Sequence, residues 1–265
     1  MNDISVIIPV NEINENTEDY FNKCIVSVTN QVEPPKKVFI VRSDNEDLKT
    51  FFDKWETPEV EGMEWVILVN TGKTDFCSQI NFGVENIDTT WFSILEIDDE
   101  YSRHWFKNSR IYIESYEEVD IFLPLVVDVD VDNTFLGFTN ESVWAMKFSE
   151  KMGVLDNNTL LNYQNYQTSG AVFRKETFED VGMLKPSMKL TFVYEFLLRA
   201  TYNDVQIMTI PKIGYKHANM REFSLFWKYK NDPESIVESD EASFWVDAAK
   251  KEYFFTYDRG LVYEK

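Results

Sequence analysis

The chain has 265 residues, of which 44% are hydrophobic and 15% aromatic, and it carries a formal net charge of −20 at pH 7. A chain of this length and apolar content can bury a large core, which excludes an intrinsically disordered protein. Its acidity excludes sequence-independent binding to nucleic acid, which needs clustered Lys and Arg, and it opposes binding to anionic membrane surfaces.

The sequence also indicates where the protein works. No apolar run approaches the roughly 20 residues that span a bilayer, and the segment MNDISVIIPV lacks the basic start of a signal peptide. The two cysteines, Cys24 and Cys77, form no metal-binding spacing and no disulfide framework. Cys24 lies among apolar residues on a predicted helix, which favours a buried free thiol. We therefore expect a cytoplasmic protein without a transmembrane segment.

The first half of the chain alternates predicted strands with predicted helices. Four apolar runs have the length of strands: residues 5–10, 38–41, 65–69 and 91–97. Between them, apolar side chains recur at helical spacing in residues 18–30, 46–55 and 76–87. Continuous apolar runs are typical of strands that are covered on both faces. The alternation therefore predicts βαβ units, an α/β fold in which helices cover both faces of a mostly parallel central sheet.

The second half is less regular. We expect helices at residues 102–116, 175–181 and 192–202, strands at residues 120–127, 169–174 and 205–210, and a hairpin near Asn133. These elements complete one domain, residues 1–220. Residues 221–265 are rich in aromatic side chains and are expected to form a helical extension. Packing on the core is the favoured role of this extension, but it could also close a binding site or pair subunits into a homo-oligomer.

Polar residues follow each of the four predicted strands of the first half. The strand ends read Pro9-Val10-Asn11-Glu12, Arg42-Ser43-Asp44-Asn45, Asn70-Thr71-Gly72-Lys73 and Glu96-Ile97-Asp98-Asp99. A single polar strand end needs no ligand, because water surrounds most loops. A parallel sheet, however, gathers the four ends at one edge, where ligands of open α/β sheets bind. The sequence therefore favours a binding crevice at this edge.

The fourth strand end carries three acids. If the strand continues through Ile97, the side chains of Glu96 and Asp98 point to the same side. Two convergent carboxylates suit Mg²⁺ or Mn²⁺, and such an ion can neutralise the charge of a diphosphate leaving group. The alternative is that these acids only cap the next helix. His217, late in the chain, is either a surface residue or a further ligand of such a metal.

Three familiar site motifs are incomplete or absent in this chain. Gly72-Lys73-Thr74 resembles the end of a phosphate-binding loop, but Ile67 occupies the position of the first glycine. Asp128, Asp130 and Asp132 begin like a calcium-binding loop, but their alternation with valines predicts a half-buried strand with its acids outward. No G-x-G-x-x-G motif follows the first strand, which argues against a dinucleotide-binding fold.

Several segments together resemble the inverting glycosyltransferases of family 2, which have the nucleotide-sugar-binding GT-A fold. ISVIIPVNE is similar to the opening strand of that family, and CIVSVTNQ is similar to the helix after it. TGKTDFCSQINFGVENI resembles G-x-x-x-A-R-N-x-G-I, and ILEIDD stands where the family carries L-D-x-D-D. SGAVFRKETFEDVGML and YEFLLRA resemble two later motifs, so the resemblance extends over residues 4–217.

The resemblance implies transfer of a sugar from a UDP- or GDP-sugar to the hydroxyl of a glycan or other acceptor, with inversion and with Mn²⁺ or Mg²⁺. It implies that the donor is held by residues at the first two strand ends and in the A-R-N-like segment: Pro9, Val10, Asn11, Glu12, Asp44 and Asn81. Glu96 would lie near the ribose or the metal, and Asp98 would bind the metal on the diphosphate. His217 would complete the metal site.

The chain departs from the family pattern at residues expected to bind the donor and to supply the catalytic base. Arg42-Ser43 stands where the family has an aspartate pair, and Gln79 replaces the arginine of A-R-N. The E-D pair that supplies the catalytic base falls on Phe192 and Val193. Glu195 is the nearest acid and the candidate catalytic base, but on a helix it lies about 200° around the axis from Val193. It could equally be a supporting or surface acid.

Functions of different classes are therefore open. The first is an active, metal-assisted glycosyltransferase with an altered acceptor side. The second is a catalytically impaired module that binds a nucleotide-sugar, a glycan or a protein partner, and the missing base favours it. A nucleotidyltransferase is a third and weaker hypothesis, because the glycine-rich first loop of that class is absent after Val10.

Overall fold

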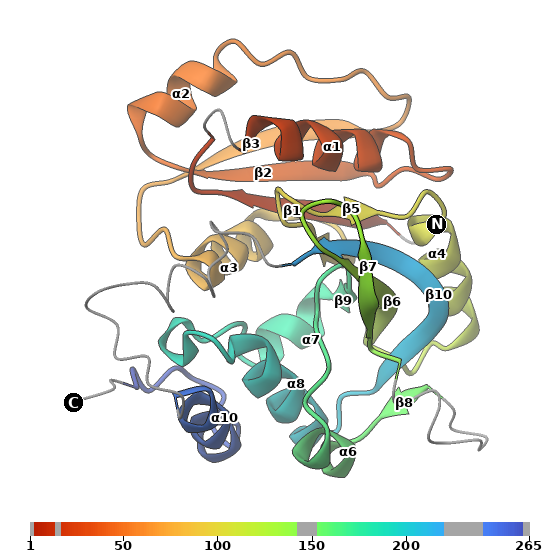
Figure 1. Cartoon of the computed structure of the whole chain (residues 1–265), viewed down its shortest axis with the longest axis vertical. Helices are drawn as coiled ribbons and strands as arrows, with labels where there is room; N and C mark the ends of the chain where they lie inside the picture. The colour runs from red at the N-terminus through yellow and green to blue at the C-terminus, as the bar shows by residue number, and fades with distance from the viewer. Residues whose placement is uncertain (1–2, 14–16, 142–152, 220–240, 262–265) are drawn as a thin grey trace.

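A mixed sheet of ten strands forms the centre of the computed structural model, which describes residues 3–13, 17–141, 153–219 and 241–261. The strands follow the order β3-β2-β1-β4-β9-β6-β10-β5, with β7 paired to β6 and β8 paired to β10. Helices lie on both faces of this sheet (Figure 1). The expected α/β fold is confirmed.

The first four strands form a parallel half of the sheet. They pair in the order β3-β2-β1-β4 and alternate with helices in the chain, as the apolar runs predicted. The bounds are β1 (Ile4–Val10), α1 (Glu18–Thr29), β2 (Lys37–Ser43), α2 (Glu46–Phe52), β3 (Glu64–Asn70), α3 (Phe76–Asn86) and β4 (Trp91–Ile94). The carboxyl ends of all four strands therefore lie at one edge.

Two hydrophobic clusters cover opposite faces of these strands. Ile7 and Val41 belong to the cluster on the side of α3, whereas Ile8 and Ile40 belong to the cluster on the side of α1 and α2. Successive residues enter different clusters because side chains alternate along a strand. Gly83 lets α3 approach the sheet closely, because a Cβ atom there would lie 2.8 Å from Ile7 Cγ2.

The second half of the sheet is more antiparallel than the sequence predicted. β9 pairs antiparallel with β4 and β6, and β5, β7 and β8 add further antiparallel pairs, whereas β6 and β10 are parallel. The predicted hairpin near Asn133 is the connection between β6 and β7. The bounds are β5 (Glu100–Tyr101), α4 (Trp105–Ser115), β6 (Ile121–Val129), β7 (Phe135–Thr139), β8 (Val154–Leu155), α6 (Asn157–Asn162), β9 (Val172–Arg174), α7 (Lys175–Asp180), η1 (Pro186–Met188), α8 (Phe192–Tyr202), β10 (Ile207–Ala218) and α10 (Glu241–Glu252).

The end of β4 differs from the prediction. The strand ends at Ile94 and does not continue through Ile97, because residues 96–99 turn the chain into β5. The prediction that Glu96 and Asp98 alternate along one strand is therefore wrong. The turn decides which acids converge.

The last long strand also differs from the prediction. β10 runs to Ala218, although we expected it to end at Ile210, before Pro211. Register shifts follow Ile210 and let the strand continue past the proline. His217 therefore lies inside a strand of the sheet, paired in register with Asp128 of β6.

The C-terminal helix α10 packs on α8. Trp245 is 2% exposed and belongs to the same cluster as the apolar residues of α3 and α8. Lys185 Nζ donates a hydrogen bond to Glu252 O at 2.9 Å. Residues 220–240 of the predicted extension lie outside the described residues, and the division of the chain at residue 220 stays a prediction. No helix in the described ranges is both long and apolar enough to cross a membrane.

Candidate active site

The turn after β4 brings two acids and a histidine together at the edge of the sheet. Asp99 N donates to Glu96 O at 3.1 Å, which closes the turn. One potential ligand atom from each of Glu96, Asp99 and His217 lies within 4.8 Å of the others. We call these three residues the carboxylate–histidine group. Two carboxylates and an imidazole are donors that a divalent metal such as Mn²⁺ accepts.

Asp99 is the buried member of this group and is 0% exposed. Its Oδ1 accepts a hydrogen bond from Ala218 N at 2.8 Å, and its Oδ2 lies 3.0 Å from His217 Nδ1. β5 follows Asp99 directly and pairs antiparallel with β10. The sheet itself therefore holds the carboxylate against the imidazole.

Glu96 is held by residues from other elements. Ser169 Oγ donates to Glu96 Oε1, and Glu96 N donates to the hydroxyl oxygen of Tyr215, both at 3.1 Å. Gly170 has a φ of +72°, and a side chain there would overlap the Tyr215 ring. Trp105 Nε1 fixes this turn by donating to Gly170 O at 2.8 Å. The Ser-Gly turn thus packs on the tyrosine that supports Glu96.

Nearby charges determine the protonation of this group. Burial alone would lower the pKa of the His217 imidazole, but Asp99, followed by Glu96 and Asp128, raises that pKa to about 9. Burial, reinforced by Asp99 and Glu96, raises the pKa of the Tyr215 hydroxyl well above its usual value. At neutral pH the imidazole is therefore protonated in the free protein, and the Tyr215 hydroxyl is neutral.

Asp98, the predicted metal ligand, lies outside the carboxylate–histidine group. It occupies the turn and is partly exposed, whereas its neighbour Asp99 points toward His217. Strand alternation would have paired Glu96 with Asp98, but the turn pairs Glu96 with Asp99. Sequence reasoning chose Asp98 in place of Asp99 and missed Ser169 and Tyr215. For Ser169 and Tyr215 the available signal was the adjacent glycine, at positions 170 and 214.

A second polar group lies at the ends of β1 and β2. Ser43 Oγ donates to Asn11 Oδ1 at 2.9 Å, and Gln79 Nε2 of α3 donates to both Ser43 Oγ, at 3.0 Å, and Asn11 Oδ1. We call Asn11, Ser43 and Gln79 the amide group. Ser43 and Gln79 are two of the departures from the family pattern, and they contact each other. A neutral hydrogen bond therefore stands where the pattern has an acid and an arginine.

Unpaired polar atoms are concentrated beside the amide group. Among the described residues, buried side-chain atoms without a hydrogen-bond partner are Arg42 Nε, Gln79 Oε1 and Thr209 Oγ1. Arg42 is 8% exposed, donates one hydrogen bond, to Ser43 O at 3.1 Å, and forms no ion pair with a described residue. A buried polar atom without a partner weakens a fold unless a water, an ion or a ligand satisfies it. Two of the three lie at this edge of the sheet.

The remaining predicted donor-binding residues have different surroundings. Pro9 and Val10 are buried in β1, so Val10 could contact a ligand only through its backbone. Glu12 and Asp44 are exposed beside the carboxyl ends of β1 and β2. Asn81 is bonded to the loop before η1: its Nδ2 donates to Leu184 O and its Oδ1 accepts from Leu184 N. The structure therefore engages the Asn81 side chain with Leu184 and not with the amide group or the carboxylate–histidine group.

Glu195, the predicted base, lies in the core. It is 0% exposed, and its two carboxylate oxygens each accept a hydrogen bond from Arg199 at 2.9 Å. Lys185 Nζ lies 2.7 Å from Glu195 Oε1. Phe192 and Val193, at the positions of the family's acids, pack against the hydrophobic cluster. Glu195 as the base stays a prediction, and its burial argues against it.

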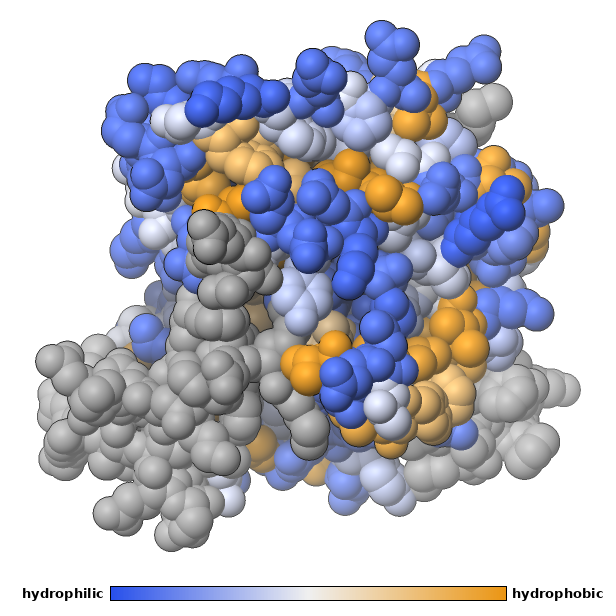
Figure 2. All heavy atoms as spheres, turned by 45° about the horizontal axis from the view of Figure 1, so that its top comes forward, coloured by the Kyte–Doolittle hydropathy of each residue, from blue (hydrophilic) through white to orange (hydrophobic). Residues whose placement is uncertain are grey.

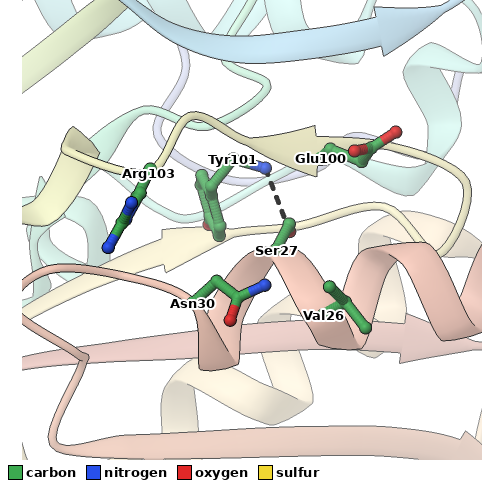
Figure 3. Close-up of a pocket in the computed structure, with 6 residues that line it drawn as sticks. All are labelled: Val26, Ser27, Asn30, Glu100, Tyr101 and Arg103. Carbon is green, nitrogen blue, oxygen red and sulfur yellow. Dashed lines mark hydrogen bonds between the residues drawn. The ribbon is translucent and has the colours of Figure 1, made fainter.

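Figure 3 shows a hollow beside α1 and β5. It has a volume of about 440 Å³ and lies between α1 and β5, where its lining residues are Val26, Ser27, Asn30, Glu100, Tyr101 and Arg103. Tyr101 N donates to Ser27 Oγ at 3.1 Å across its floor. No member of the carboxylate–histidine group or of the amide group lines it.

Solved structures share this fold at low sequence identity. Residues 1–349 of S. aureus TarS in complex with UDP match with a TM-score of 0.61 and 14% identity, over 95% of this chain and 72% of that chain. The complex with UDP-GlcNAc matches with a TM-score of 0.61 and 14% identity, over 97% and 74%. A longer structure of S. aureus TarS matches with a TM-score of 0.58 and 16% identity, over 95% of this chain and 43% of that chain.

The sequence itself identifies the family. No curated protein matches the chain as a whole sequence. The model of glycosyl transferase family 2, however, matches residues 5–182. This range includes the polar ends of β1 and β2 and the turn at residues 96–99. The chain therefore belongs to glycosyl transferase family 2.

Proposed function

We propose that this protein transfers a sugar from a nucleotide-diphosphate sugar to an acceptor hydroxyl, with inversion and with the help of a divalent metal. The observation that carries the proposal is the carboxylate–histidine group at the carboxyl end of β4, with ligand atoms within 4.8 Å of one another. Membership of the family supports the reaction class. The UDP and UDP-GlcNAc complexes of the structurally similar TarS support a nucleotide-sugar donor, which we propose is a UDP- or GDP-sugar.

The residues present fit a divalent metal. Glu96, Asp99 and His217 would hold Mn²⁺ or Mg²⁺, with Mn²⁺ favoured by the imidazole. Such an ion supplies positive charge beside the diphosphate as it leaves. Ser169 and Tyr215 orient Glu96, and the backbone of β10 orients Asp99. Asp98, in the same turn, is the acid that could approach the ion from the solvent side.

The donor would extend along the edge from the carboxylate–histidine group to the amide group. β4, β1 and β2 are neighbours in the sheet and run parallel, so their carboxyl ends lie side by side along one edge. The diphosphate would lie at the end of β4 and the base at the ends of β1 and β2. The sugar would face the acceptor, a glycan or another hydroxyl compound.

A second function, binding without transfer, is favoured by a specific observation. An inverting displacement needs a base for the acceptor hydroxyl. Positions 192 and 193 carry Phe and Val, and Glu195 is sealed in ion pairs with Lys185 and Arg199. A chain in this state could still bind a nucleotide-sugar.

Thermal unfolding tests the proposal. Mn²⁺ together with UDP or GDP should raise the melting temperature, and Asp99→Asn should abolish the rise. Asp98→Asn is the matched comparison and should reduce the rise only in part. An unchanged melting temperature with every nucleotide would contradict the proposal.

Donor hydrolysis separates the two functions. A glycosyltransferase releases sugar slowly from its donor to water even without the acceptor. Release of free sugar from UDP- or GDP-sugars would support transfer. Tight binding without any release would support the binding module.

We also propose that the protein works in the cytoplasm. The support is chemical: Cys24 and Cys77 are both free and buried, and burial raises the pKa of both thiols. Hydrophilic residues cover much of the coloured surface in Figure 2, between separate apolar patches.

A further inference from the structure

β3 is the outer strand of the parallel half of the sheet, and one of its sides is unpaired (Figure 1). Glu64 N donates to Lys36 O, so the backbone of Glu64 faces β2. Because these groups alternate along a strand, the N–H and C=O groups of Trp65, Ile67 and Val69 face away from β2. No residue in the described part of the chain bonds to these outward groups.

The strand at this free edge is apolar and partly exposed. It reads EWVILVN, and Ile67 and Val69 are each 38% exposed. The preceding loop is bonded to the indole of Trp65, which donates to Pro58 O at 2.9 Å, and not to the backbone of β3. Natural proteins protect a free edge with lysine, proline or a bulge, and β3 contains none of these. Its free edge is therefore suited to pairing with another strand.

The sequence of β3 is complementary to itself in antiparallel register. A two-fold axis at the central residue, Ile67, places Ile67 opposite its own copy and Trp65 opposite Val69 of the second copy. All outward N–H and C=O groups of both strands then form hydrogen-bonded pairs. These three side chains share one face of the strand, so apolar residues meet apolar residues. Glu64 lies opposite the uncharged Asn70, so no like charges oppose each other within the strand pair.

Charges beside the two ends of β3 favour the same direction of pairing. Glu61 precedes the strand, Lys73 follows it, and both are exposed. Antiparallel pairing brings the end with Glu61 in one copy to the end with Lys73 in the second copy. Parallel pairing would instead bring like charges to the same end.

We propose that two copies of this chain pair through β3 into a dimer with one continuous sheet. The pairing is antiparallel and centred on Ile67. Because the strands of the two copies run in opposite directions, the two carboxylate–histidine groups lie at opposite ends of the joint sheet. The interface contains no residue of the carboxylate–histidine group or of the amide group, so this inference does not depend on the proposed function.

Mass measurements test the dimer. Sedimentation of the unaltered protein should show a monomer–dimer equilibrium at about 0.15 M salt or above, where repulsion between two chains of net charge −20 is screened. Ile67→Lys places two lysines opposite each other and should lower the association constant at least about 10-fold. Leu136→Lys is the matched control, because Leu136 is 43% exposed on β7, which pairs with β6 alone among the described strands. This control should associate as the unaltered protein does.

Cysteine cross-linking tests the register. Opposed Cα atoms of a hydrogen-bonded antiparallel pair lie about 5.5 Å apart, within the range that a disulfide bridges. Ile67→Cys should therefore form a covalent dimer under mild oxidation. Val69→Cys, at a position of equal exposure, should not, because the two copies of residue 69 lie about 14 Å apart along the strands. The native thiols of Cys24 and Cys77 are buried and serve as an internal background.

Several outcomes would overturn the inference. These are a monomer at every concentration, a dimer that Ile67→Lys leaves unchanged, and a dimer that Leu136→Lys weakens equally. Equal cross-linking of Ile67→Cys and Val69→Cys would overturn it as well, and this test holds even if Ile67→Lys fails to fold. The proposed function is tested separately, because monomeric Ile67→Lys should keep the rise in melting temperature with Mn²⁺ and nucleotide.

Discussion

Asp99 and Glu195 are two fully buried, ion-paired acids among the described residues, and their groups differ in their access to water. At the edge of the sheet, Asp99 pairs with His217, whose side chain is 22% exposed. In the core, Glu195 pairs with Lys185 and Arg199, and each of these three side chains is at most 1% exposed. The first group is open on one side to a ligand, whereas the second is closed on every side. Acids of similar chemistry therefore have different functions here: the open group can bind, and the closed group stabilises the fold.

Breaking the closed group should have the largest effect on stability. Glu195→Gln leaves the charges of Lys185 and Arg199 buried without a carboxylate, and loss of one partner of a buried ion pair costs about 3–5 kcal/mol. Urea unfolding should measure a decrease of that size in the free energy of unfolding. A decrease below about 1 kcal/mol, the value of a surface pair, would show that the group is not structural.

Breaking the open group should affect metal binding more than it affects stability. Asp99→Asn should lower the affinity for Mn²⁺ by at least about 10-fold, because it removes a charged ligand. It should destabilise the fold less than Glu195→Gln, since His217 is partly exposed and can release its proton to water. Calorimetry with Mn²⁺ and urea unfolding of both variants would check the two effects together. A greater loss of stability in Asp99→Asn than in Glu195→Gln would reverse the comparison.

Tyr215→Phe should have an intermediate effect on stability and on Mn²⁺ affinity. The variant keeps the ring that packs on Gly170 but removes the hydroxyl that accepts from Glu96 N, a hydrogen bond worth about 1 kcal/mol. We expect a loss of stability of that size and weaker Mn²⁺ binding. An unchanged Mn²⁺ affinity would mean that the hydroxyl does not position Glu96.

Ser169→Ala should have the smallest effect. Ser169 donates one partly exposed hydrogen bond to Glu96, so its removal should lower Mn²⁺ affinity a few-fold and leave stability within about 0.5 kcal/mol of the parent. Titration of Mn²⁺ into both proteins checks the first value, and urea unfolding checks the second. A complete loss of Mn²⁺ binding would show that Ser169 does more than orient the carboxylate.

Local sequence patterns predicted the architecture well. The runs that became β1, β2 and β3, and the helix that became α8, are specified by short-range apolar periodicity. The family could be predicted from its motifs, and its model matches residues 5–182. Strand direction in the second half could not be predicted, because the pairing of β9 with β4 and β6 joins segments far apart in the chain.

The site was predicted less completely, for a physical reason. The acids at residues 96–99 and His217 were identified, but the choice between Asp98 and Asp99 depends on a turn that β10 imposes through β5. The contact of Ser43 with Gln79 also joins separate elements, so the sequence showed them only as two unrelated departures from the family pattern. The ion pair of Glu195 with Lys185 could not be predicted either, because Lys185 lies outside the helix that carries Glu195.

A crystal grown with Mn²⁺ and UDP tests the central claim most directly, by anomalous diffraction at the manganese absorption edge. The account predicts one strong peak about 2.0–2.3 Å from carboxylate oxygens of Glu96 and Asp99 and from a ring nitrogen of His217, with the diphosphate on its open side. A manganese peak at other residues would contradict this prediction. A bound nucleotide with the Asp99–His217 ion pair intact and no manganese beside it would contradict it as well.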